Sequence, residues 1–66
     1  MSNGIISIRS CRANANMTQQ EFADAIGVSK ATVINWEQGK TFPRLTDVKK
    51  ISEISSVPIS LIFLPE

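Results

Sequence analysis

Residues 18–38 of the chain read TQQEFADAIGVSKATVINWEQ and predict two short helices joined by a tight turn. Thr18 stands three residues before Glu21, the spacing of a capping box, which satisfies two unpaired backbone donors at the start of a helix. Gly27 marks the end of this first helix, because glycine adopts the left-handed conformation without steric cost. Ser29 is suited to cap the second helix. The stretch is therefore typical of a helix-turn-helix unit.

The length and composition indicate one small domain that spans residues 1–66. With 66 residues, of which 42% are hydrophobic, the chain has enough apolar side chains for a single small core. Cys11 is the only cysteine and there is no histidine, so we expect no metal site and no cofactor, and we expect Cys11 to be buried and inert. No apolar run approaches the roughly 20 residues that span a bilayer, which predicts a soluble, cytoplasmic protein without a membrane partner.

Apolar residues recur at helical spacing along most of the chain and predict a compact, all-α bundle of five helices. The helices are expected over about residues 5–14, 19–26, 30–38, 44–55 and 59–63. The inner face of the fourth helix is predicted to be formed by Leu45, Val48, Ile51, Ser52 and Ser55. Pro58 interrupts the chain after that helix and is well placed in the first turn of the fifth.

Arg12 lies on or beside the apolar face of the first predicted helix, where an unpaired charge is unfavourable. Glu37 follows the inward-facing Trp36 and is therefore the candidate partner for a buried salt bridge. The alternative is that Arg12 is exposed and has no partner.

The residue types argue against an enzyme that acts on a small-molecule substrate. The sequence has no histidine, one cysteine that we expect to be buried, and no glycine-rich phosphate loop. The formal net charge is only +1, but residues 29–50 carry five basic residues against two acidic ones, a balance of +3: Lys30, Lys40, Arg44, Lys49 and Lys50 against Glu37 and Asp47. This stretch favours a polyanion as the partner, and an ordinary solvated surface is the alternative.

The second helix of the unit has an outer face suited to reading bases in the major groove of DNA. Val33 and Trp36 are predicted to point inward, which leaves four candidate base-reading residues outside: Lys30, Ala31, Thr32 and Asn35. Lysine can donate to guanine, asparagine can form two hydrogen bonds with adenine, and the small side chains can contact a thymine methyl group. The candidate phosphate contacts are Gln19, Ser29, Lys40 and Arg44. For each residue taken alone, an ordinary solvated surface position is the alternative.

The stretch TQQEFADAIGVSKATVINWEQGK resembles the helix-turn-helix of the phage repressor and Cro-like regulators, the XRE family. The resemblance covers about residues 5–63 and implies a lambda-repressor-like DNA-binding domain in which the second helix of the unit is the recognition helix. It also implies that Gln19 contacts phosphate, that residues 30–32 and Asn35 face bases, and that a buried salt bridge joins the first helix to the recognition helix. Members of the family typically bind pseudo-palindromic double-stranded operators as homodimers. The resemblance also implies a bacterial or phage-encoded protein.

The sequence departs from the family pattern at two positions. Ile34 occupies an outward position that is usually polar, which suits contact with a thymine methyl group or a partner. Ser55 stands where the pattern has a buried leucine. Residues 61–64 are all apolar, and their side chains cannot all face the core from one short helix. Three of them are therefore a candidate dimer contact: Leu61, Phe63 and Leu64. The alternative is that these side chains close the small core.

These observations predict a sequence-specific DNA-binding transcriptional regulator of Cro or short-repressor type, which reads operator DNA with the helix at residues 30–38. We expect no enzymatic activity. The alternative is a protein-interaction module, such as an antitoxin-like or adaptor domain, for which DNA binding is secondary. Sequence-dependent binding in a gel-shift titration over a range of salt favours the first function, and its absence favours the second.

Overall fold

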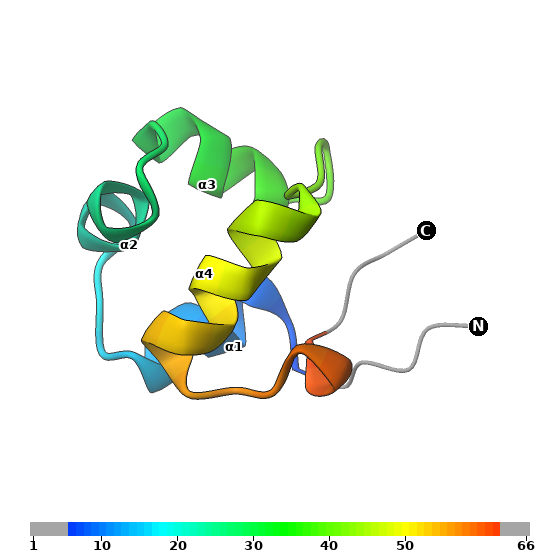
Figure 1. Cartoon of the computed structure of the whole chain (residues 1–66). Coiled ribbons are helices and arrows are strands. Elements are labelled where there is room, and N and C mark those ends of the chain that lie inside the picture. The colour runs from blue at the N-terminus through cyan, green and yellow to red at the C-terminus, as the bar shows by residue number, and fades with distance from the viewer. Residues whose placement is uncertain (1–5, 63–66) are drawn as a thin grey trace.

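The computed structural model describes residues 6–62, which contain four α-helices and one short 3₁₀ helix (Figure 1). The α-helices are α1 (Ile8–Asn14), α2 (Gln19–Ile26), α3 (Lys30–Glu37) and α4 (Leu45–Ser55), and the 3₁₀ helix is η1 (Ile59–Leu61). α2 packs against α3, and α4 packs against α1 and α2. The predicted all-α class is confirmed for the described residues. In this part of the chain, no helix combines the length and apolar character needed to cross a membrane.

Local side-chain contacts set the ends of α2 and the start of α3. Thr18 Oγ1 accepts a hydrogen bond from the Glu21 backbone N at 3.1 Å, and Glu21 Oε1 accepts one from the Thr18 backbone N at 2.9 Å. This is the predicted capping box, and α2 has the predicted bounds. Gly27 ends the helix with a φ of 94°, in the left-handed region. Ser29 Oγ then accepts a backbone N–H of the next turn at 3.2 Å and caps α3.

The first helix is shorter than the sequence predicted. α1 begins at Ile8 and not near residue 5, because Ser7 is its N-cap and accepts a backbone N–H of the first turn at 3.1 Å. Ile6 forms an isolated parallel β-bridge with Ile62 instead of a helical turn. This bridge holds the two ends of the described chain side by side (Figure 1). Residue 5 itself lies outside the described residues.

The predicted count of five helices is not confirmed in full, because the short fifth helix is present only as the single 3₁₀ turn η1. Pro58 precedes this turn, and Ile62 directly after it has extended backbone angles, φ −78° and ψ 122°. The Ile6 backbone N donates to the Leu61 carbonyl at 2.9 Å, so the chain leaves the turn to pair with the N-terminal segment. Phe63, the predicted end of the helix, lies outside the described residues.

One core of buried side chains lies between the four helices. Its members come from every α-helix and from the C-terminal segment: Ile8, Cys11, Phe22, Ala23, Ile26, Val33, Trp36, Val48, Ile51, Val57 and Ile62. Leu45 is not among them, and the prediction that it faces inward is wrong, since it is 66% exposed. The reason is that α4 begins at Leu45 and its first turn extends past the core, which the helix reaches at Val48.

Two small polar side chains are accommodated within this core. Ser55 is buried, and its Oγ donates to the Ile51 carbonyl at 2.6 Å, one turn back in α4. Cys11 is fully buried, as predicted; burial raises the pKa of its thiol, and a side-chain hydrogen bond with Ser55 opposes the rise. The Asn14 amide donates to the Ser55 carbonyl at 2.6 Å and ties α1 to the end of α4. Serine is therefore accommodated at this buried position, because its hydroxyl group has a partner.

Replacing Gly27 with alanine is expected to lower the free energy of unfolding by about 1 kcal/mol, because a Cβ atom is unfavourable at positive φ. No atom lies within 4 Å of the position that this Cβ would take, so the cost comes from the backbone and not from a collision. Gly27→Asn is the matched control and should lose less, since asparagine tolerates the left-handed region. Urea denaturation followed by circular dichroism measures both variants, and an unchanged midpoint for Gly27→Ala would contradict the argument.

Candidate nucleic-acid interface

The exposed face of α3 is set by the two side chains that hold this helix on the core. Val33 and Trp36 are buried and define its inner face. Lys30 and Ala31, in the first turn, are exposed. The N-terminal half of α3 therefore presents one charged and one small side chain away from the core, directly after the turn that begins at Gly27.

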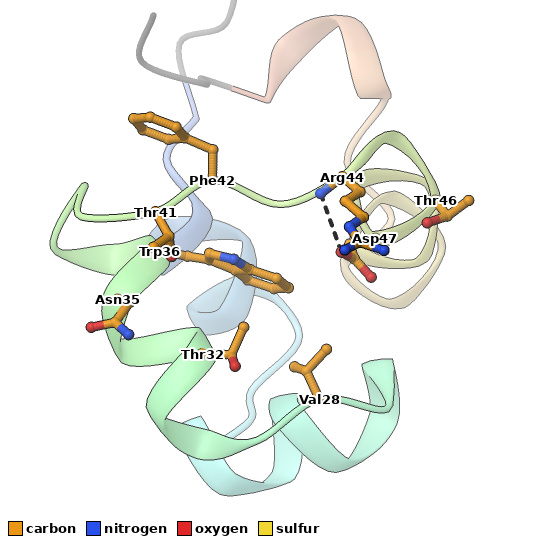
Figure 2. Close-up of a pocket in the computed structure, with 9 residues that line it drawn as sticks. All are labelled: Val28, Thr32, Asn35, Trp36, Thr41, Phe42, Arg44, Thr46 and Asp47. Atoms are coloured by element: carbon orange, nitrogen blue, oxygen red, sulfur yellow. Dashed lines mark hydrogen bonds between the residues drawn. The ribbon is translucent and has the colours of Figure 1, made fainter.

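The other two candidate base-reading residues are half-buried. Thr32 Oγ1 lies 2.9 Å from Ser29 Oγ, so the hydroxyl groups of the cap and of the first turn share a hydrogen bond. Asn35 lies further along α3 (Figure 2), and its side-chain amide has no hydrogen-bond partner within residues 6–62. Its two donors and its acceptor are thus available to a ligand. Ile34, expected to face outward, is half-buried.

A groove of about 470 Å³ lies between α3 and the start of α4 (Figure 2). Its lining comes from α3, the turn before it, the following loop and the first turn of α4: Val28, Thr32, Asn35, Trp36, Thr41, Phe42, Arg44, Thr46 and Asp47. The threonine, asparagine and arginine side chains are of the types that contact the base edges and phosphates of nucleic acids. Across residues 6–62, no group of three or more histidine, cysteine, aspartate or glutamate side chains is placed to hold a metal ion.

The four candidate phosphate contacts lie at helix starts and in the loop after α3. Gln19 is the first residue of α2, and Ser29 is the N-cap of α3. Lys40 is exposed, and its backbone N donates to the Asn35 carbonyl at 2.9 Å, which ties the loop to α3. Arg44 is exposed at the N-cap of α4, where its backbone N donates to the Asp47 carboxylate at 3.1 Å, the dashed line in Figure 2.

The structure brings Arg12 of α1 and Glu37 of α3 together. Arg12 Nε donates to Glu37 Oε2 at 2.7 Å and Nη2 donates to Oε1 at 3.3 Å, a two-point contact. The Glu37 side chain is 6% exposed and that of Arg12 is 18% exposed. Arg12 Nη1 also donates to the Met17 carbonyl at 3.0 Å, between α1 and α2. The hydrogen bond with Glu37 raises the pKa of Arg12 above its ordinary value, so the guanidinium stays charged.

Sequence reasoning missed one contact that joins this pair to α2. Gln19 Nε2 donates to Glu37 Oε1 at 3.2 Å, so the carboxylate at the end of α3 contacts both preceding helices. No periodic pattern in a single sequence reports a hydrogen bond between such distant residues. Phe42, half-exposed on the groove, was also missed; its place in the loop between Gly39 and Pro43 is the only signal for it.

The acidic side chains around α3 are engaged in contacts within the protein. Glu37 pairs with Arg12, and Asp47 binds the backbone at the start of α4. Lys30 and Lys40, at the beginning of α3 and shortly after its end, are exposed. The charge left toward solvent around α3 is therefore positive, which favours a polyanion.

The candidate dimer contact lies only partly within the described residues. Leu61 is 36% exposed, whereas Ile62 next to it is buried in the core. Ile59 adds a second exposed apolar side chain from η1. Phe63 and Leu64 lie outside the described residues.

Comparisons with known proteins identify the family. The family model described as Helix-turn-helix matches residues 8–62, from the first residue of α1 to the residue after η1. The cryptic phage CTXphi transcriptional repressor RstR of Vibrio cholerae is 38% identical over 53 residues, which are 80% of this chain and 48% of RstR. An uncharacterised HTH-type transcriptional regulator of Archaeoglobus fulgidus is 39% identical over 57 residues, 86% of this chain and 80% of that protein.

Other relatives carry the same region within longer proteins. The type II methyltransferase M.SsoII of Shigella sonnei is 38% identical over 55 residues, 79% of this chain but 14% of the enzyme. The chain thus spans about half the length of RstR and a small part of M.SsoII. No solved structure matches the chain significantly. The chain belongs to the helix-turn-helix family of XRE type, and these relatives are named mainly as transcriptional regulators.

Arg12→Met is expected to lower the free energy of unfolding by about 3 kcal/mol, because it leaves the buried Glu37 carboxylate without its charged partner. Arg9→Met removes an exposed arginine from the same helix and is the matched control, with an expected change below about 0.5 kcal/mol. Chemical denaturation at neutral pH measures both variants. Equal midpoints for the two would show that the ion pair does not stabilise the fold.

Proposed function

We propose that the protein is a sequence-specific DNA-binding transcriptional regulator of Cro or short-repressor type, which reads its operator with α3 in the major groove. The main support for this proposal is that α3 has one buried face and one exposed face. Val33 and Trp36 hold one face on the core, while Lys30 and Asn35 offer donors that the described part of the protein does not use. A helix divided in this way presents side chains to base edges while its position stays fixed.

In the proposed complex, four residues of α3 read bases. Lys30 donates to O6 and N7 of a guanine, and Asn35 forms two hydrogen bonds with an adenine. Ala31 and Thr32 contact thymine methyl groups. The exposure of the first turn of α3 and the unpartnered Asn35 amide support these roles.

The proposed phosphate contacts place α3 on the duplex without reading sequence. Gln19 and Ser29 stand at the starts of α2 and α3, where backbone N–H groups and the partial positive charge of a helix favour an anion. Lys40 and Arg44 contact phosphates of the DNA backbone from the loop after α3. Two exposed cations in a loop tied to α3 support this assignment.

The proposed assembly is a homodimer on a pseudo-palindromic operator, with one copy of α3 in each of two successive major grooves. Leu61, Phe63 and Leu64 form the proposed two-fold contact, and the exposure of Leu61 on η1 supports it. In this proposal residues 1–66 act as a single non-enzymatic domain in the cytoplasm, where the operator is accessible.

Asn35→Ala is expected to reduce discrimination at one base pair of the operator by about 1–3 kcal/mol. Lys40→Ala is the contrasting variant, which should weaken binding to all sequences and lower the slope of log affinity against log salt by about 1. Titrations of an operator and a scrambled duplex measure both effects. Equal losses on the two duplexes for Asn35→Ala would rule out its base-reading role.

The proposed function as a whole is tested by selecting bound duplexes from a random-sequence pool. The selected duplex should bind at least about a hundredfold more tightly than a scrambled one, and binding should weaken steeply between about 50 and 200 mM salt. Equal affinity for the two duplexes, or no binding, would contradict the proposal. Either result would favour the alternative, a protein-interaction module such as an antitoxin-like or adaptor domain.

A further inference from the structure

The carboxylate of Glu37 is the point at which α1, α2 and α3 meet. Its Oε2 accepts a hydrogen bond from Arg12 Nε at 2.7 Å. Its Oε1 accepts one from Arg12 Nη2 at 3.3 Å and one from Gln19 Nε2 at 3.2 Å. Because the side chain is 6% exposed, water competes little for these bonds. The first residue of α2 is thereby joined to the last residue of α3.

This contact also determines which end of the Gln19 side chain faces the protein. A carboxylate accepts hydrogen bonds and donates none, so it holds the amide through an N–H group. The second N–H and the carbonyl oxygen have no hydrogen-bond partner within residues 6–62. A glutamine without such a contact samples many rotamers and both orientations of its amide. Glu37 selects one of these arrangements and leaves one N–H for an acceptor outside the protein.

We infer that Glu37 is a positioning residue for DNA binding, which acts by holding Gln19 in the orientation that donates to a phosphate. The inference rests on the proposed DNA-binding function and gives a role in it to a residue that does not contact DNA. The hydrogen bond to a charged carboxylate polarises the amide and strengthens its remaining donor. Arg12 neutralises Glu37, so the carboxylate does not repel the phosphate that Gln19 contacts.

Removal of the carboxylate has two opposed effects on DNA affinity. Glu37→Gln releases Gln19, which weakens binding. It also leaves Arg12 without its counter-charge, which strengthens binding to any polyanion. A double-mutant cycle separates the two, because the effect of charge is the same whether residue 19 is glutamine or alanine.

The experiment measures the dissociation constant of the selected duplex for the unchanged protein, Gln19→Ala, Glu37→Gln and the double variant. In the unchanged protein, Gln19→Ala should weaken binding by about three- to tenfold, as expected for one hydrogen bond. In the Glu37→Gln background, the same substitution should weaken binding by less than about twofold. Gln20→Ala is the matched control. The Gln20 amide donates to Asp24 Oδ1 at 2.9 Å and not to Glu37, so its effect should be equal in both backgrounds.

An equal effect of Gln19→Ala in both backgrounds would overturn the inference and leave the proposed function intact. Failure of the unchanged protein to bind any duplex would overturn the proposed function and the inference with it. Glu37→Asp retains the charge but draws the carboxylate away from Gln19, and it gives the same comparison if Glu37→Gln does not fold.

An NMR measurement on the free protein gives a second, independent readout. The side-chain amide signal of Gln19 should be ordered in the unchanged protein and should move toward the position of an exposed glutamine in both Glu37 variants. The signal of Gln20 should stay in place. A Gln19 signal that is unaffected by Glu37→Gln would overturn the inference without any reference to DNA.

Discussion

The two-point contact between Arg12 and Glu37 is the constraint on which the arrangement of the helices depends. Desolvation of the two charges offsets much of their attraction, so the net stability of such a pair is modest, but either charge buried alone is strongly unfavourable. Arrangements of α1 and α3 that separate the two groups are therefore strongly unfavourable. Through the Met17 carbonyl and the Gln19 amide, the same pair also fixes the segment before α2 and the first residue of that helix.

In the proposed function, stability and recognition use different side chains of α3. Val33 and Trp36 belong to the core, and substitutions on the opposite side can change what the helix contacts without disturbing its packing. The comparisons fit this separation, because related domains occur in proteins named as a repressor and as a methyltransferase. A fold shared in this way does not determine function, which in the proposed regulator resides in the exposed residues of α3 and of the loop that follows it.

Local sequence signals predicted the helix-turn-helix closely, but they could not predict contacts between residues that are distant in the sequence. The capping box at Thr18 and the glycine turn determined α2 to the residue. The fifth helix is only a 3₁₀ turn because Ile6 pairs with Ile62 at the other end of the described chain, and no local pattern reports this competition. The prediction that Leu45 is buried was wrong, because apolar spacing identifies the inner face of a helix but not where the core ends along that helix. The hydrogen bond from Gln19 to the ion pair could not be predicted either, because it too joins residues that are distant in the sequence.

In the proposed function, the start of α2, α3 and the following loop form one rigid DNA-binding face. An NMR titration of the isotope-labelled protein with the selected duplex tests it most directly. The largest shifts in the saturated complex should fall on residues 30–35, with further shifts at Gln19 and Lys40, while the core signals of Phe22 and Ile51 should stay near their free positions. Unchanged signals across residues 30–35 in a saturated complex would contradict it.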